Sequence, residues 1–351
     1  MLKPVKRMDS LLNGLPRRGY LSQVFKNLKC YKEGTRVTGM NGQADVVVAR
    51  ASDYGSLKNV LPRTMEALSG FILNADKVVV KVNLCDARPP ETGAITHPAS
   101  LDALLRFLRE QAGFEDDIYV VEGDSGTVLA DHYVRWFGLM PVIERWGAKW
   151  LNVVKAKRRR LVHIDGGLFK ALKLPEELLD AFFISLAKLK TNPITHFTGV
   201  LKNQYGCLPF IYKAKFHPWI DQAIADINQA LRPSLGIIDG VIAQVGIHGP
   251  AYGVPIRAGL LIVGTDLVAV DATGARILGF RPTAIGHLRE CAKRGLGNLR
   301  GFSMELLGFD DQNSLPRVPN LYNPVEALLF RRLFRLAPLL QAKARGRHRG
   351  Q

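Results

Sequence analysis

The sequence predicts an α/β protein built on a mostly parallel sheet with helices on both faces. From about residue 44 onward, short apolar segments rich in Val, Ile and Leu alternate with longer amphipathic segments. The apolar segments lack the polar alternation of a half-exposed strand, as expected for strands that are covered on both sides. A chain of 351 residues with 47% hydrophobic residues can also bury a large core.

The expected elements follow one another regularly along the core. We expect strands at 45–51, 77–83, 118–122, 150–154, 181–189, 235–242 and 259–264. We expect helices at 57–73, 98–111, 130–137, 141–146, 218–230 and 267–278. The predicted organisation is a basic N-terminal arm over 1–43, an α/β core over 44–305 and a basic amphipathic C-terminal tail over 306–351.

The net charge of +17 is concentrated in three segments. Residues 1–37 carry nine Lys or Arg and two acids, residues 155–160 carry five Lys or Arg, and residues 327–351 carry seven and no acid. The rest of the chain is therefore close to neutral. A neutral body without an aromatic-interleaved basic patch disfavours nucleic acid as a partner. The run at 155–160 favours a solvated loop or strand edge over a polyanion site.

Both arms show helical spacing of apolar residues. In the N-terminal arm these are Leu21, Val24, Phe25 and Leu28, which indicate a helix docked on the protein or, alternatively, lying on an anionic membrane. The C-terminal tail repeats the pattern with basic residues beside it. Its apolar face is formed by Leu329, Leu333, Leu336 and Leu340.

Cysteine use and hydropathy predict a cytoplasmic protein that can be peripheral to a membrane. The four cysteines, Cys30, Cys85, Cys207 and Cys291, lie far apart, as is usual in a reducing compartment. There is no CxxC pair, so the chain has no local zinc or iron–sulfur motif, and its cofactor cannot be named. No apolar run is long enough to span a bilayer, and we expect no signal peptide.

Polar side chains follow two of the predicted strands, where an open parallel sheet binds its ligands. Glu122 and Asp124 form an acidic turn that could hold a cation or a sugar hydroxyl, or simply cap the following helix. We name both as proton-transfer candidates. The candidate ligand-binding residues after the strand at 77–83 are Lys81, Asn83, Thr96 and His97, and either of the last two could cap the next helix.

The stretch 184–209 is the most informative part of the sequence. It passes from an apolar strand into two lysines, Lys188 and Lys190, that point the same way and could hold one anion together. Lys190 and His196 are our further catalytic candidates. The remaining candidate ligand-binding residues here are Thr191, Asn192, Thr198, Lys202 and Asn203. The alternative is that the lysines are ordinary exposed side chains and that His196 only fills a hydrogen-bonding position.

Three further positions complete the candidate set. Asp239 ends a strand, and His248 is the titratable side chain of a glycine-rich loop at 246–255 that lacks a P-loop ending. Asp266 is expected to be the N-cap of a helix, and Cys207 a buried structural thiol rather than a reactive one. No Ser-His-Asp elbow, HExxH or kinase signature is present, which disfavours those reaction classes.

Several of these landmarks together resemble the domain-of-unknown-function family 362. They are KVNLC and THP at 81–85 and 96–98, VVEGDSG at 120–126, KLKT and TGVLKNQYG at 188–206, IIDGV and GIHGP at 237–250, and GTDLVAVDATG at 264–274. The resemblance covers roughly residues 45–300. The family's usual Lys-Thr-His reads Lys190-Thr191-Asn192 here. Many members carry ferredoxin-type cysteine clusters, which implies redox chemistry, but this chain lacks them and would take electrons from a separate electron-transfer protein.

These observations predict an enzyme acting on a small anionic substrate bound by lysines at the strand ends. The resemblance implies an oxidoreductase. The alternative is a non-catalytic anion-binding module held at a membrane surface by its basic arms.

Overall fold

A computed structural model describes the protein over residues 36–37 and 44–321, with gaps at 69–72, 74, 127, 166 and 247–252, and at 328, 329, 332 and 333. The expectations for the N-terminal arm and for most of the C-terminal tail lie outside these residues. Among the described residues, no helix is both long and apolar enough to cross a membrane.

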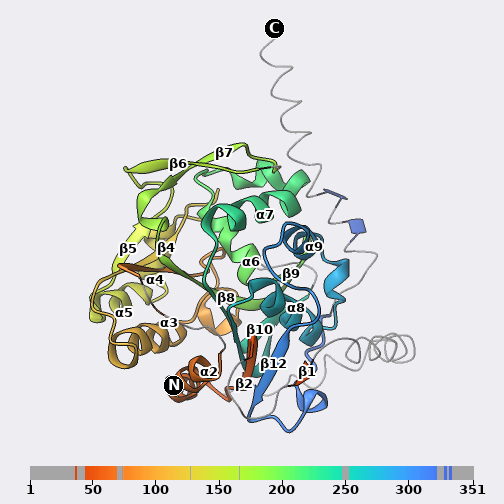
Figure 1. Ribbon diagram of the computed structural model, residues 1–351. Helices are drawn as coiled ribbons and strands as arrows, with labels where there is room; N and C mark the ends of the chain where they lie inside the picture. Colours follow the sequence, from red (N-terminus) through yellow and green to blue (C-terminus); the bar gives the residue numbers. More distant parts are fainter. Residues whose placement is uncertain are drawn as a thin grey trace, which may run out of the picture.

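A twisted ten-stranded sheet runs through the molecule (Figure 1). Its strands lie in the order β1-β12-β2-β11-β10-β8-β3-β4-β5, with the short β9 paired to β8. Their bounds are β1 Arg36–Val37, β12 Ser303–Leu307, β2 Val46–Arg50, β11 Val254–Gly264, β10 Leu235–Val245, β8 Phe182–Asn192, β3 Lys77–Lys81, β4 Asp117–Glu122, β5 Lys149–Asn152 and β9 His196–Thr198.

The sheet is mostly parallel, which confirms the predicted fold class. The strands β10, β8, β3, β4 and β5 form one parallel block, and β1, β12 and β2 form another. Strand β11 is antiparallel to both of its neighbours and joins the two blocks, and β9 folds back on β8. Because β3, β4, β8 and β10 are parallel, their carboxyl ends meet at one edge of the sheet.

Eight α-helices of the described chain cover the two faces of the sheet (Figure 1). They are α2 Leu57–Glu66, α3 Pro98–Arg106, α4 Ala130–Trp136, α5 Leu139–Arg145, α6 Val200–Asn203, α7 Ile220–Leu231, α8 Leu267–Ile277 and α9 Gly286–Lys293. Helices α2 to α5 bury their apolar sides against one face, with Val47 and Leu186 in the same core cluster. Helices α6 to α9 pack on the other face, with Val46 and Leu189. The strand residues alternate between the two cores, which explains why the strands are apolar throughout.

All seven strands and all six helices expected from the sequence are present, with shifted ends. The helix expected at 57–73 ends at Glu66, and the helix expected at 98–111 is α3 followed by a π-helical segment, Phe107–Gln111. Helices α6 and α9 and the strands β1, β6, β7, β9 and β12 were not among these expected elements.

Strands β6 (Arg159–His163) and β7 (Ala171–Pro175) form a separate antiparallel hairpin beside α7 (Figure 1). The basic run at 155–160 leads into this hairpin, as the expectation of a loop or strand edge implied. Arg159 donates to the backbone carbonyls of Val153 and Val154 before β6 and of Lys173 in β7. Arg160 forms an exposed ion pair with Asp180. The run thus has a structural role.

Described residues beyond both expected domain boundaries pack on the core. Strand β1 pairs with β12, and β12 itself spans the boundary expected at 305. Beyond it, Leu315 and Val318 are buried in the same core as α8, and Val318 N–H donates to Ile277.

Candidate functional site

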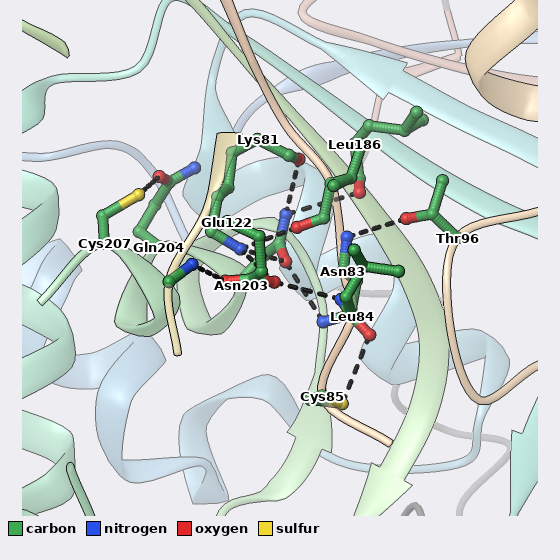
Figure 2. A network of polar contacts seen from close by, with 12 residues as sticks. Lys81, Asn83, Leu84, Cys85, Thr96, Glu122, Leu186, Asn203, Gln204 and Cys207 are labelled. Carbon is green, nitrogen blue, oxygen red and sulfur yellow. Dashed lines mark hydrogen bonds and ion pairs between the residues drawn. The ribbon is translucent and has the colours of Figure 1, made fainter. Parts of the chain in front are cut away.

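Lys81 and Glu122 form a buried ion pair at the edge where the parallel strands end (Figure 2). Lys81 is the last residue of β3 and Glu122 the last of β4. The Lys81 ammonium donates to a Glu122 carboxylate oxygen at 2.8 Å and to the Val82 carbonyl at 2.6 Å. The same carboxylate accepts the N–H groups of Leu84 and Gly123. Three hydrogen-bond donors therefore surround the Glu122 side chain.

Asn203, the last residue of α6, connects two strands, β3 and β8, beside this pair (Figure 2). Its amide nitrogen donates to the Lys81 carbonyl, to the Ser185 hydroxyl and, at 3.4 Å, to the Leu186 carbonyl. Its amide oxygen accepts from the Asn83 side chain at 3.1 Å. Asn83 in turn exchanges two hydrogen bonds with Thr96, one from each backbone nitrogen. These residues therefore form a rigid polar layer at the sheet edge.

Gly206 is required by the close approach of the chain to this layer. A Cβ atom there would lie 2.2 Å from a Glu122 carboxylate oxygen and 2.7 Å from the Lys81 ammonium. Any side chain would displace the ion pair. The glycine of the KNQYG motif is therefore explained by packing against two charged groups.

Beside this layer lies a cavity of about 150 Å³, which we call the lysine cavity. It is smaller than a typical drug-sized pocket and has room only for a small molecule. Four lysines and one carboxylate line it, together with amide, hydroxyl and thiol groups. The lining residues are Lys81, Asn83, Leu84, Cys85, Glu122, Gly123, Ser125, Lys190, Asn192, Thr198, Lys202, Asn203, Tyr205, Gly206 and Lys213.

The charge of the cavity is not balanced. Glu122 is already paired with Lys81, and Lys190 makes its contacts with Asn83, Ala94 and Cys85, none of which is an acid. Lys202 has neither a hydrogen bond nor an ion pair within the described chain. The cavity thus holds cationic groups in excess over carboxylates.

Burial changes the protonation of two of these lysines. Lys202 as a residue is partly accessible, but burial of its amine and then the charge of Lys190 lower its pKa to about 7. Burial also lowers the pKa of Lys213 to about 8, and the negative charge of Glu122 opposes this shift. A bound anion would favour the charged form of both amines and raise their pKa values again.

Asp271 of α8 positions the helix that carries Lys202 and Asn203. Its carboxylate accepts the backbone N–H groups of Val200 and Leu201 at 2.6 and 3.0 Å. Burial raises the pKa of Asp271 to about 7, and these two hydrogen bonds act in the opposite direction. A Cβ atom on Gly199 would lie 2.0 Å from this carboxylate, so the helix can begin here only after a glycine.

Lys188 does not share an anion with Lys190. It forms a second ion pair, with Asp239 of β10 at 2.9 Å, and both side chains are 0% exposed. Ser100 and the Val241 N–H also donate to the Asp239 carboxylate, and Lys188 contacts the Tyr54 hydroxyl. Neither Lys188 nor Asp239 lines the lysine cavity, so the structure separates them from the other lysines.

Several predicted site residues make structural contacts. The Asp124 carboxylate accepts hydrogen bonds from the Ala130 N–H at the start of α4 and from the Asn152 side chain. The first of these contacts agrees with the alternative that this turn caps the following helix. His97 is the N-cap of α3, and its Nδ1 accepts from Ala99 N–H at 3.1 Å. Burial lowers the pKa of His97. Asp266 is the N-cap of α8, as expected.

The β8–β9 turn accounts for three more of these residues. The Asn192 side-chain oxygen accepts the N–H groups of Ile194 and Thr195 and thereby closes the turn, while its residue still borders the cavity. Thr191 donates to the Gly246 carbonyl. His196 takes a left-handed conformation with φ 67° and packs near Phe280, outside the cavity lining. His248 lies outside the described residues.

Lys213 and Cys85 line the cavity although neither was among the predicted site residues. Lys213 begins the 3-10 helix Lys213–Trp219, shortly after the KNQYG motif but outside it, and its ammonium donates to the Asp124 carbonyl. Cys85 stands in KVNLC, but nothing in its spacing distinguishes it from a structural thiol. Cys207 is buried, which raises its pKa to about 12, in agreement with the expected structural role.

In the part of the chain that the structure describes, no three His, Cys, Asp or Glu side chains gather as a ligand set for a metal ion. The three described cysteines also lie in separate places, with Cys207 and Cys291 in different apolar cores. They therefore do not fit an iron–sulfur cluster of the kind that the family resemblance implied.

Comparison with known proteins agrees with the resemblance found in the motifs. A model of the domain of unknown function DUF362 matches residues 78–276, more than half of the chain. The chain belongs to the DUF362 family. It is also 28% identical over 268 residues to a thylakoid-associated protein of Synechocystis, a match that covers 72% of this chain and 79% of that protein. No similar solved structure was found.

Proposed function

We propose that this DUF362 protein is an enzyme that binds a small oxyanion, a carboxylate or a phosphate, in the lysine cavity. The observation that carries the proposal is Lys202, an enclosed lysine that borders a small cavity and forms no ion pair among the described residues, so that only the more distant charge of Asp221 favours its charged form among the carboxylates. Enclosed charges without partners are costly, and a ligand of opposite charge removes that cost. The nearby ammonium groups of Lys190 and Lys213 add to the attraction.

The rest of the site supports the same ligand. Asn83 and Asn203 are fixed by hydrogen bonds on both sides, and Lys81 is held by Glu122, so the cavity wall is formed before the ligand arrives. A preformed wall lowers the entropic cost of binding. The size of the cavity limits the ligand to a small acid or inorganic phosphate.

Calorimetry with the full chain tests the binding step, with inorganic phosphate and acetate as probes near neutral pH. We expect saturable binding, weakened at least about tenfold in Lys202→Met because the variant keeps the apolar stem and loses the charge. Lys58→Met is the matched control, since Lys58 is exposed on α2. Binding near neutral pH should also take up protons, because the anion stabilises the charged amines. Equal binding by the wild type and Lys202→Met would refute the proposal.

Turnover separates an enzyme from a binding module. Small carboxylic acids can be incubated with the wild type and with Lys202→Met, with and without a chemical reductant, and followed by NMR. Conversion that disappears in Lys202→Met supports an enzyme, and conversion that needs the reductant supports an oxidoreductase. Saturable binding with no change in any acid supports the non-catalytic module.

A second function, attachment to a membrane surface, is favoured by the described residues of the C-terminal segment. Leu328, Leu329 and Leu333 are helical and exposed, and Arg332 lies beside them. Leu329 and Leu333 are four residues apart and share the face expected from the sequence. The Synechocystis relative is named for its association with thylakoids.

Flotation with vesicles containing anionic lipid tests this attachment. Leu329→Asp with Leu333→Asp should release the protein from the vesicles, and added salt should weaken the binding. Binding that is unchanged in the double variant would exclude this segment as the contact.

A further inference from the structure

Cys85 places a thiol in the wall of the lysine cavity. It follows β3 on the loop that crosses the sheet edge, is exposed, and lines the cavity. Lys190 donates to its sulfur at 3.3 Å, and the sulfur lies 3.4 Å from the side-chain oxygen of Asn83 (Figure 2). The buried ammonium group is therefore held beside the sulfur, close to any ligand group that the sulfur attacks.

The same wall offers a place for a carboxylate. Thr198 is only 5% exposed, lines the cavity, and its hydroxyl has no protein partner in the described chain. It stands directly across the β8–β9 pair from Lys190. Because the residue is buried except toward the cavity, its hydroxyl is available to donate a hydrogen bond to a ligand there. Lys202 offers a charge in the same wall. These groups are observed independently of the cysteine.

The two other described cysteines have no comparable surroundings. Cys207 and Cys291 are fully buried, and burial raises the pKa of both thiols. Neither lines the cavity. Buried thiols in apolar surroundings are inert, whereas a reactive cysteine is accessible and lies beside cationic groups. Within the described residues, Cys85 alone combines accessibility with a contact to an ammonium group.

We propose that Cys85 is the nucleophile of the lysine cavity and adds to the carbonyl carbon of a short aldehydic or 2-oxo acid. The proposal rests on the anion binding proposed above. Lys202 and Thr198 would hold the carboxylate of the substrate. The bond between sulfur and the carbonyl carbon forms, the carbonyl π bond breaks, and its electron pair moves to oxygen. The thiol proton ends on that oxygen, so the thiohemiacetal forms without any further reactant. Lys190 stabilises the oxygen as charge develops on it.

Alkylation of the full chain with an anionic and a neutral reagent tests this assignment. Iodoacetate carries a carboxylate and iodoacetamide does not. In each case the sulfur bonds to carbon, iodide leaves and the thiol proton passes to solvent. The rate at Cys85 is read from its peptide by mass spectrometry, with glutathione as a thiol that has no anion site. We expect the iodoacetate-to-iodoacetamide rate ratio at Cys85 to exceed that of glutathione by at least about tenfold, since the cavity concentrates the anion.

Matched variants test whether the cavity causes the preference of Cys85 for iodoacetate over iodoacetamide. Lys202→Met and Thr198→Val should lower the ratio toward that of glutathione, and the exposed control Lys58→Met should leave it unchanged. Glyoxylate should protect Cys85 at lower concentration than acetate, because only glyoxylate can form the adduct. Both are carboxylates, so equal protection would mean that binding occurs without addition.

Two outcomes would overturn the inference and can be told apart. If phosphate and acetate bind with dependence on Lys202 but Cys85 reacts with the ratio of glutathione, the anion site stands and the role of Cys85 is wrong. If no anion binds and the ratio is again that of glutathione, the proposed function fails as well. A Cys85 that reacts with neither reagent would also overturn its role as a nucleophile.

Discussion

Replacing Lys202 by Met should make the protein more stable at acidic and neutral pH. The wild type keeps a cation beside a small cavity, where it forms no ion pair in the described chain, and the cost of that charge appears as a pKa of about 7. Methionine retains the apolar stem and fills similar space. The substitution therefore removes the unfavourable charge with little loss of packing.

The size of the effect follows from the pKa. A decrease from 10.5 to about 7 corresponds to a cost on the order of 5 kcal/mol, at about 1.4 kcal/mol per pKa unit. Lys202 keeps some accessible surface, and water in the cavity screens its charge, so we expect roughly half of this, about 2.5 kcal/mol. For a domain of this size that gives an increase in Tm of roughly 5 °C.

The increase in stability caused by Lys202→Met should depend on pH in a defined direction. Below the folded pKa, Lys202 is charged in both the folded and the unfolded state, and the full cost is present. Between the folded and the unfolded pKa, the folded state releases its proton first, and the stability of the wild type rises with pH. Above the unfolded pKa, the amine is neutral in both states and the cost is gone. The difference in Tm between Lys202→Met and the wild type should thus be large at about pH 6 and small at about pH 10.

Thermal unfolding of both proteins over this pH range, in buffers without small oxyanions, is the assay. Added phosphate should then stabilise the wild type by about 1.4 kcal/mol when its concentration is ten times the Kd, and should stabilise the variant by at most about 0.4 kcal/mol, since its Kd is at least about tenfold higher. A variant that is less stable than the wild type at about pH 6, or a difference that does not vary with pH, would refute the reasoning. Either result would mean that Lys202 has a partner that compensates its charge.

Two further predictions concern buried carboxylates outside the cavity. Asp239→Asn leaves Lys188 charged, buried and without its counter-ion, and should cost about 3–5 kcal/mol in denaturant unfolding. Asp117→Asn, in the exposed pair with Lys149, is the control and should cost at most about 1 kcal/mol; equal losses would show that burial does not set the cost. Asp271→Ala should cost about 2–3 kcal/mol because two N–H groups of α6 lose their acceptor, and phosphate affinity should fall with it. Unchanged affinity in that variant would separate α6 from ligand binding.

The local pattern of the sequence was sufficient to predict a covered sheet and the edge of that sheet at which the candidate site lies. Apolar segments such as 235–242 identify covered strands because side chains on both faces need partners. Parallel strands also place their carboxyl ends together, so Lys81, Glu122 and Lys190 could be expected near one another. The caps at His97 and Asp266 were likewise readable, since capping is a contact between residues two or three apart.

The hairpin β6–β7 and strand β12 could not be predicted in this way. Strand β6 includes Arg159 and Arg160, whose charges hide the strand pattern, and only pairing with β7 defines it. Strand β12 lies beside β2, whose residues are more than 250 positions away in the chain. Such pairing depends on contacts that local periodicity does not contain.

The sequence by itself determined which groups stand at the strand ends, because strand periodicity and chain order fix that edge. Only the tertiary structure decided which charges are compensated. Lys188 and Lys190 look equivalent in sequence, yet Asp239 on the neighbouring strand neutralises the first, while the second faces Cys85 and the cavity. Lys213 enters the same cavity from the 3-10 helix that follows the KNQYG motif, although it belongs to no motif. The physical reason is that charge balance depends on distances of a few ångströms between segments far apart in the chain, and packing alone sets those distances.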